Sequence, residues 1–149
     1  MRIFEYDGKK YLAFWGGLFS QWAPYSFDVY SNHFYSAEHY MMWAKAKLFN
    51  DEESARMILR EPDPKKVKAM GRKVKKFDED LWNKEKFEIV VTGNFHKFKQ
   101  NPEIKKELFK YKDCIFVEGS PYDKIWGVGL HFKSKEIENP NNWKGENLL

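Results

Sequence analysis

An acid and an amine lie two helical turns apart in the stretch from residue 34 to residue 49. Apolar residues recur there at the spacing of a helix packed on a core, and these are Ala37, Tyr40, Met41, Ala44 and Leu48. Glu38 and Lys45 belong to a neighbouring row that also holds Met42 and Phe49, and about 10 Å of helix axis separate the two charges. Because half of that row is apolar, we expect the acid and the amine to flank a concavity rather than open water.

Each of these two charges has a chemical and a structural interpretation. Glu38 can serve as a general acid or base, but the helix dipole alone also favours an acid in the first turn. Lys45 can serve as a nucleophile that forms a Schiff base, since burial lowers the pKa of a lysine. A solvated lysine is the simpler interpretation. The pattern of residues alone leaves both pairs of interpretations open.

The composition indicates a class of ligand without fixing it. Aromatic residues make up 18% of the chain, enough to fill a core and also to stack on planar ligands. A net charge of +4 favours an anionic partner such as a phosphate, a nucleotide or a nucleic acid. The basic residues are densest in residues 65–76. We interpret that stretch as a helix whose basic face is either solvated or in contact with phosphate or DNA.

Several kinds of site are excluded by residue type and spacing. Cys114 is the one cysteine, so neither a disulfide framework nor a thiolate zinc site is expected. The segment Gly127-Val128-Gly129 is too short for a dinucleotide-binding fingerprint. We therefore expect no metal and no cofactor, in agreement with the unpaired spacing of the four histidines, His33, His39, His96 and His131. Neither a signal peptide nor a membrane span is evident, which predicts a cytoplasmic protein.

The pattern of elements predicts an α+β fold, with one helix-rich domain over residues 1–149. A β-hairpin is predicted around Asp7-Gly8 and a second around Ser31-Asn32, and a short strand is predicted over residues 114–117. Trp143 suggests that the polar tail docks on the rest of the chain.

Four side chains predict where helices begin, and a fifth helix should follow Asn101-Pro102. The four N-caps are Ser36, Asp51, Asp63 and Asp78. The third helix is expected to reach residue 76 with Val74 turned inward. The fourth should cover residues 79–99 and offer its aromatic residues, Phe87 and Phe95 among them, to the core.

Several motifs, found in one order along nearly the whole chain, resemble the NADAR (YbiA-like) family of N-glycosidases. Residues 19–24 read Phe-Ser-Gln-Trp-Ala-Pro, close to the family's F/L-S-N-F/W-x-P, with Gln21 where Asn is common. Residues 36–40 with Lys45 match its T/S-x-E-H/Q-Y-x-x-x-x-K core. Further matches are residues 69–72, Trp82, residues 97–103, residues 120–129 and residues 142–149.

The resemblance implies hydrolysis of the N-glycosidic bond between a ribose C1 and an amine nitrogen. The implied substrates are ribosylamino-pyrimidine phosphates of early riboflavin synthesis and ADP-ribose attached to guanine in DNA. The basic residues in 65–76 favour the second, because a nucleic acid offers several phosphates to neutralise. In this scheme Glu38 moves protons and Lys45 traps the opened sugar as a Schiff base. Asp123 orients ribose hydroxyls or assists proton transfer, and no metal or redox cofactor is needed.

The resemblance also implies a set of substrate-binding residues. Arg72 would pair with a phosphate, and Trp22 and Trp126 would enclose the base or ribose. The remaining members of this set are Ser20, Gln21, His39 and Gly127. Two alternatives remain at this point: a non-catalytic reader of ADP-ribose or nucleotides, and a DNA-binding module centred on residues 65–76. A reader would not need the pair of Glu38 and Lys45.

Overall fold

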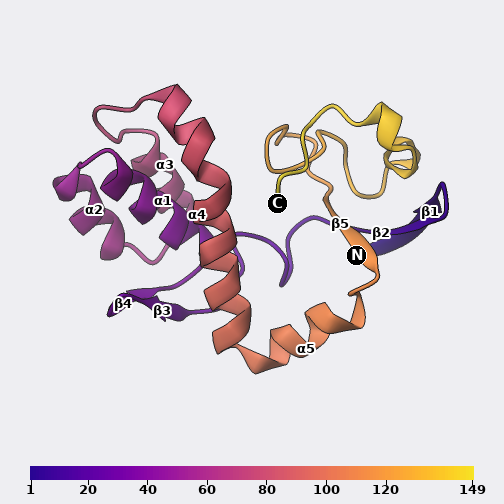
Figure 1. The fold of residues 1–149 in the computed structure, drawn as a ribbon, viewed down its shortest axis with the longest axis horizontal. Coiled ribbons are helices and arrows are strands. Elements are labelled where there is room, and N and C mark those ends of the chain that lie inside the picture. The colour runs from indigo at the N-terminus through magenta and orange to yellow at the C-terminus, as the bar shows by residue number, and fades with distance from the viewer. The chain divides into compact units, whose positions relative to one another are not determined.

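The computed structural model describes residues 1–149 and divides into two compact units (Figure 1). Unit 1 consists of Met1–Ser20 together with Lys106–Leu149, and unit 2 is the continuous segment Gln21–Lys105. Strands lie near both ends of the chain and five α-helices lie between them, which confirms the α+β class. That residues 1–149 act as a single domain stays a prediction.

Unit 1 is built on a three-stranded sheet with the order β1-β2-β5. β1 (Arg2–Tyr6) and β2 (Lys9–Phe14) form the predicted antiparallel hairpin, and Asp7 and Gly8 at its turn both have positive φ. β5 (Cys114–Glu118) lies parallel to β2 on its other edge. As the central strand, β2 is buried from Tyr11 to Phe14, and its side chains contribute to an apolar core.

The segment after β5 closes this core from the C-terminal side. It contains two short 3₁₀ helices, η1 (Lys135–Glu138) and η2 (Pro140–Asn142). Trp143 docks as expected, because its ring edge contacts Tyr11 and its indole N–H donates to the carbonyl of Ile137 at 2.9 Å. Asn147 then pairs with β5, donating to the carbonyl of Phe116 and accepting from the amide of Glu118.

Unit 2 begins with the second hairpin, formed by β3 (Phe27–Val29) and β4 (Asn32–Phe34). Its turn is one residue earlier than predicted. Tyr30 and Ser31, rather than Ser31 and Asn32, have positive φ, at 51° and 66°. The physical reason is the pairing of Val29 with Asn32, which leaves a two-residue loop whose twist matches that of the strands.

α1 (Ala37–Leu48) is the central helix of unit 2, and α2 (Glu52–Leu59), α3 (Pro64–Gly71) and α4 (Glu79–Gln100) pack around it. The four predicted N-caps are confirmed. Each side chain accepts a hydrogen bond from a backbone amide in its own first turn, and the caps are Ser36, Asp51, Asp63 and Asp78. α5 (Pro102–Lys110) follows Asn101 as predicted and carries the boundary between the two units.

The prediction that the third helix reaches residue 76 is wrong, because α3 ends at Gly71. A continued helix would bond the amide of Lys75 to the carbonyl of Gly71. That amide instead donates to the carboxylate of Asp51, at 3.0 Å. Val74 is still buried, but from an irregular segment. The basic residues of this stretch therefore do not share one face of a helix.

The expectation that α4 turns its aromatic residues to the core is wrong for two of them. Phe87 and Phe95 are 47% and 57% exposed. The buried line of α4 is Val90, Gly93 and Lys97 instead, because Gly93 has no side chain and the ring of Tyr40 takes that space. None of the helices combines the length and the apolar character that crossing a membrane requires.

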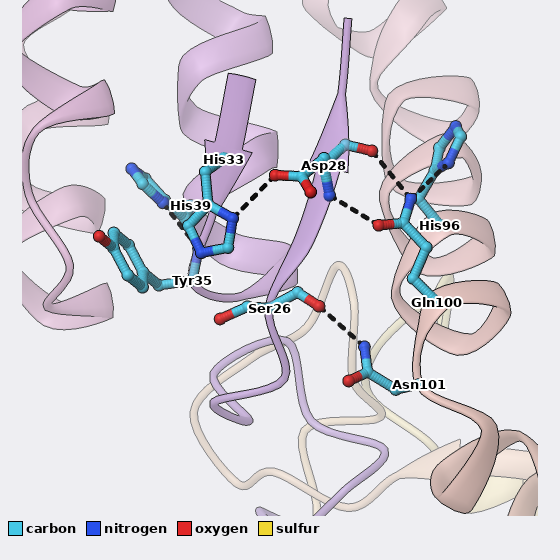
Figure 2. Close-up of polar contacts among 8 residues, drawn as sticks. All are labelled: Ser26, Asp28, His33, Tyr35, His39, His96, Gln100 and Asn101. Carbon is cyan, nitrogen blue, oxygen red and sulfur yellow. Dashed lines mark hydrogen bonds and ion pairs between the residues drawn. The ribbon is translucent and has the colours of Figure 1, made fainter. Parts of the chain in front are cut away.

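Side-chain amides attach the C-terminal end of α4 to the edge of β3 (Figure 2). The Gln100 amide accepts from the backbone N–H of Asp28 and donates to its carbonyl, both at 2.8 Å. Asn101 donates to the carbonyl of Ser26 at 2.9 Å. Gln100 thus makes the two hydrogen bonds that a neighbouring strand would make, and the hairpin is fixed relative to α4.

Candidate active site

Glu38 lies in the first turn of α1 and is buried, with 6% of its surface exposed. The hairpin of β3 and β4 leads into this turn, and Ser36 caps it. The backbone N–H of Glu38 donates to the carbonyl of Gln21 at 2.9 Å, which holds the preceding loop against the helix. Burial of a carboxyl group is costly, so the helix dipole acting on an exposed acid does not explain this residue.

Lys45 is half-buried two turns further along α1. Burial is the main influence on its pKa and lowers it, the charge of Glu38 acts to raise it, and the charge of Arg72 lowers it again. The net effect is a pKa below that of an ordinary lysine. The predicted acid and the predicted phosphate-binding arginine are therefore both close enough to act on the amine of Lys45.

Arg72 reaches this neighbourhood because α3 comes very close to α1. A side chain at Gly71 would collide with the Met42 thioether where it now lies, so glycine favours this close approach. Arg72 follows directly as the C-cap of α3, with its side chain exposed. An exposed guanidinium beside the Glu38–Lys45 row can bind an anionic group of a ligand.

Two aromatic rings lie against the amine of Lys45. Its Nζ is 4.8 Å from the ring centroid of Phe77 and 5.4 Å from that of Trp82, both within the range of cation–π attraction. Phe49 contacts the nearer of these rings, with 5.3 Å between the Phe49 and Phe77 centroids. The sequence prediction gave Phe77 no role. The sequence did contain a signal for Phe77: it directly precedes the N-cap Asp78, and an apolar residue there commonly packs against the fourth residue of the helix, here Trp82, in a hydrophobic staple.

Gln21 is buried and ties three segments of unit 2 together. Its Oε1 accepts from the side-chain amide of Asn94 on α4 at 2.7 Å, and its Nε2 lies 3.7 Å from the Met41 sulfur on α1. Sequence reasoning missed Asn94, whose only signal was a polar residue within the apolar part of a helix. Trp22 is 41% exposed, with the amine of Lys68 at 5.9 Å from its ring. Its ring is thus accessible for stacking.

His39 is fully buried and both of its ring nitrogens are used inside unit 2. Nδ1 accepts from the backbone N–H of Tyr35 at 3.0 Å (Figure 2), and Nε2 donates to the carbonyl of Ile58 at 2.6 Å. Burial lowers the pKa of His39, which suits a neutral ring with one donor and one acceptor. These contacts favour a positioning role, and direct binding of substrate by His39 stays a prediction.

Four of the predicted site residues, Ser20, Asp123, Trp126 and Gly127, belong to unit 1. Asp123 shapes a turn, since its Oδ1 accepts from the amides of Ile125 and Trp126 at 2.9 and 2.8 Å. Gly127 is packed so closely against backbone carbonyls that a side chain would not fit. Ser20 closes a turn through its amide and the carbonyl of Gly17. Their meeting with Glu38 and Lys45 in one site stays a prediction.

The structure contains no group of three or more His, Cys, Asp or Glu side chains arranged to bind a metal ion. The chemistry that unit 2 can support instead uses a buried carboxyl group for proton transfer and a lysine with a lowered pKa for attack on an electrophilic carbon.

Comparison with known proteins gives a consistent assignment. The chain is 40% identical over 153 residues to N-glycosidase R617 of Acanthamoeba polyphaga mimivirus, covering 94% of this chain and 90% of the relative. It is 29% identical over 119 residues to N-glycosidase YbiA of Escherichia coli (strain K12), covering 80% and 72% of the two chains. The NMR structure of E. coli YbiA superposes with a TM-score of 0.73 at 26% identity, over 91% of this chain and 76% of that one. The model of the NADAR domain matches residues 13–149, and the chain therefore belongs to the NADAR family.

Proposed function

We propose that this protein is an N-glycosidase that hydrolyses the bond between a ribose C1 and an amine nitrogen through a Schiff base on Lys45. The observation that carries the proposal is the coupling, on one helix, of a buried carboxyl group at Glu38 to a desolvated amine at Lys45. Two relatives named N-glycosidase, from a virus and a bacterium, support the reaction class.

The first half of the proposed reaction opens the sugar. Glu38 gives a proton to the ring oxygen as the bond from C1 to that oxygen breaks, and C1 becomes an iminium carbon bonded to the base nitrogen. The neutral amine of Lys45 then adds to C1 with its lone pair. One proton passes from this nitrogen to the base nitrogen, which leaves with the electron pair of its bond to C1.

The second half releases the sugar from the enzyme. The nitrogen of Lys45 is now doubly bonded to C1 and positively charged, and a water molecule adds to C1 while Glu38 accepts its proton. The proton of the new C1 hydroxyl group passes to the Lys45 nitrogen, the bond between C1 and that nitrogen breaks, and its electron pair leaves with the neutral amine. C1 is released as an aldehyde, which closes to the ribose ring. Glu38 acts first as an acid and then as a base.

Phosphorylated ribosyl groups are the substrates that the surroundings favour. The two candidates are ADP-ribose linked to guanine in DNA and a ribosylamino-pyrimidine phosphate of riboflavin synthesis. In either case Arg72 pairs with a phosphate and the exposed ring of Trp22 stacks on a base. Contact of Trp126 with the base or ribose, and of Asp123 with a ribose hydroxyl, is what the family motif implies and stays a prediction. We favour the DNA-linked substrate because Lys65, Lys66 and Lys68 continue the positive charge along α3.

The experiment that tests this function is borohydride trapping with each of the two substrates, read by intact-protein mass and by release of free base. Reduction of the Schiff base should add the mass of the sugar moiety to the wild-type protein and inactivate it. Lys45→Ala should form no adduct and lose at least about 1,000-fold in turnover. An adduct on Lys45→Ala, or full turnover by that variant, would contradict the Lys45 role.

Glu38→Gln separates catalysis from simple binding. Gln is close to isosteric but cannot transfer protons, so turnover should fall by about 100-fold or more while substrate binding is retained. Near-normal turnover would remove Glu38 from the mechanism. A wild-type protein that binds ADP-ribose tightly but releases no base from either substrate would instead be a non-catalytic reader.

A further inference from the structure

The rings of Phe77 and Trp82 lie on the Lys45 amine at distances that favour a positive charge there. Phe77 comes from the segment between α3 and α4, and Trp82 comes from the first turns of α4. Both centroids lie within 5.4 Å of the same Nζ, and the ring of Phe49, the C-cap of α1, packs edge-on against Phe77. Phe77 is nevertheless 48% exposed, so burying its own surface does not account for its position.

We propose that Phe77 and Trp82 form an aromatic cradle that holds the Lys45 nitrogen in its charged states, first as ammonium and then as the iminium joined to the sugar. The second state rests on the function proposed above. The negative faces of aromatic rings attract cations whether the charge sits on an ammonium or on an iminium nitrogen. They offer nothing comparable to the neutral amine, which is the attacking form.

The cradle and the burial of Lys45 have opposite consequences, and the reaction needs both. Burial favours the neutral nucleophile by penalising any charge on this nitrogen. The same penalty would disfavour the iminium intermediate, which also carries a positive charge. Aromatic faces compensate for it without a carboxylate at contact distance, which would hold the resting lysine fully protonated. Phe77 and Trp82 are thus positioning residues for the nucleophile rather than catalytic residues.

Two charged groups influence the pKa of Lys45. Glu38 on its own helix and Arg72 at the end of α3 are the charges that act on it, with opposite effects. From α4 and the segment before it, the neutral rings of Trp82 and Phe77 face it. Glu52 of α2 is paired with Lys47 at 2.7 Å rather than with Lys45.

The first test follows Lys45 itself and needs no substrate. NMR of protein labelled at the lysine side-chain carbons should show Lys45 titrating at lower pH in Phe77→Leu than in wild type, because the ammonium loses a cation–π partner. Phe77→Tyr keeps the aromatic face and should titrate as wild type does. Phe95→Leu is the matched control, since Lys99 lies 5.4 Å from that exposed ring and Lys45 does not contact it. Unchanged titration in both Phe77→Leu and Trp82→Leu would overturn the proposal.

The second test follows the iminium. With substrate and borohydride, the trapped fraction in Phe77→Leu should fall roughly fivefold, with kcat lowered and KM little changed, and Phe77→Tyr should restore both. A loss that Phe77→Tyr does not restore would show a packing role and contradict the cradle.

The outcomes distinguish the two proposals. A shifted titration with no adduct in any variant would contradict the glycosidase mechanism and leave the cradle supported for the ammonium. An adduct formed by the wild type, with no shift in the Lys45 titration and no fivefold loss in Phe77→Leu, would support the glycosidase mechanism and contradict the cradle.

Discussion

At the scale of single residues, Lys45 illustrates how a reactive group is held at a cost to stability. Its pKa is lowered in the folded protein, mainly by burial, so the native state binds a proton less tightly than the unfolded chain does. The penalty on folding is fully present below the folded pKa. It disappears as the pH rises from the folded pKa toward 10.5, the ordinary value. Stability should therefore increase with pH across this range.

Lys45→Met should consequently make the protein more stable at pH 7 while abolishing turnover. We expect a gain of about 1 kcal/mol, or roughly 3 °C in Tm, because the apolar side chain fills the same space without a charge. The gain in stability should shrink as the pH approaches 10.5, the ordinary pKa of a lysine side chain. Thermal unfolding followed by circular dichroism measures it, with Lys47→Met as the control on the same helix. A lower Tm for Lys45→Met at pH 7 would contradict this account.

The sequence was informative for residues whose role follows from one helix and its spacing. Glu38 and Lys45 could be predicted from the row they share with Met42 and Phe49, because helical periodicity alone places them on one side. The bond between Gln21 and Asn94 could not, since it joins residues 73 positions apart. His39 matched the family motif, yet both of its nitrogens are bonded within unit 2, a distinction that only tertiary contacts provide.

At the scale of elements, the approach of α3 to α1 at Gly71 determines where Arg72 lies. Gly71→Ala improves intrinsic helix propensity, but its new methyl group would overlap the Met42 side chain. We expect a net loss of about 1–2 kcal/mol in the free energy of unfolding and a rise in KM, because α3 and Arg72 must move away. Urea denaturation and steady-state kinetics measure the two effects.

A double-mutant cycle checks that the Gly71 effect arises from this contact. In a Met42→Ala background the space is free, so Gly71→Ala should be neutral or stabilising there. Lys66→Ala, an exposed substitution on the same helix, serves as the control for stability and should change the free energy of unfolding little. Equal losses from Gly71→Ala in both backgrounds would place the cause elsewhere.

Helix starts were easier to predict than helix ends or helix faces. The caps at Ser36, Asp51 and Asp78 are local signals, and all three were confirmed. The end of α3 depends on Asp51 capturing the amide of Lys75, a contact between segments 24 residues apart. The orientation of α4 depends on where Tyr40 packs, so Phe87 and Phe95 could not be placed from the apolar pattern alone.

At the scale of the whole molecule, the excess of positive charge predicts different salt responses for the two substrate classes. For ADP-ribosylated oligonucleotide, log kcat/KM should fall steeply with log salt concentration, because several phosphates are neutralised on binding. For a ribosylamino-pyrimidine phosphate the slope should be shallow. Replacing Lys65, Lys66 and Lys68 by Gln should flatten the first slope by up to about 2 and leave the second unchanged. Equal slopes for both substrates would argue against recognition of the nucleic acid backbone.

The strand order of the unit 1 sheet bears on how the chain folds while it is being synthesised. β1, the antiparallel partner of β2, lies next to it in the sequence, but the other neighbour of β2, β5, begins at Cys114. Unit 2 lies entirely between them in the sequence and can fold on the ribosome while one edge of β2 is still open. Completion of unit 1 requires almost the whole chain. We therefore expect unit 2 to fold first during synthesis, and we expect chaperones to bind the early hairpin, whose strand edge is still open.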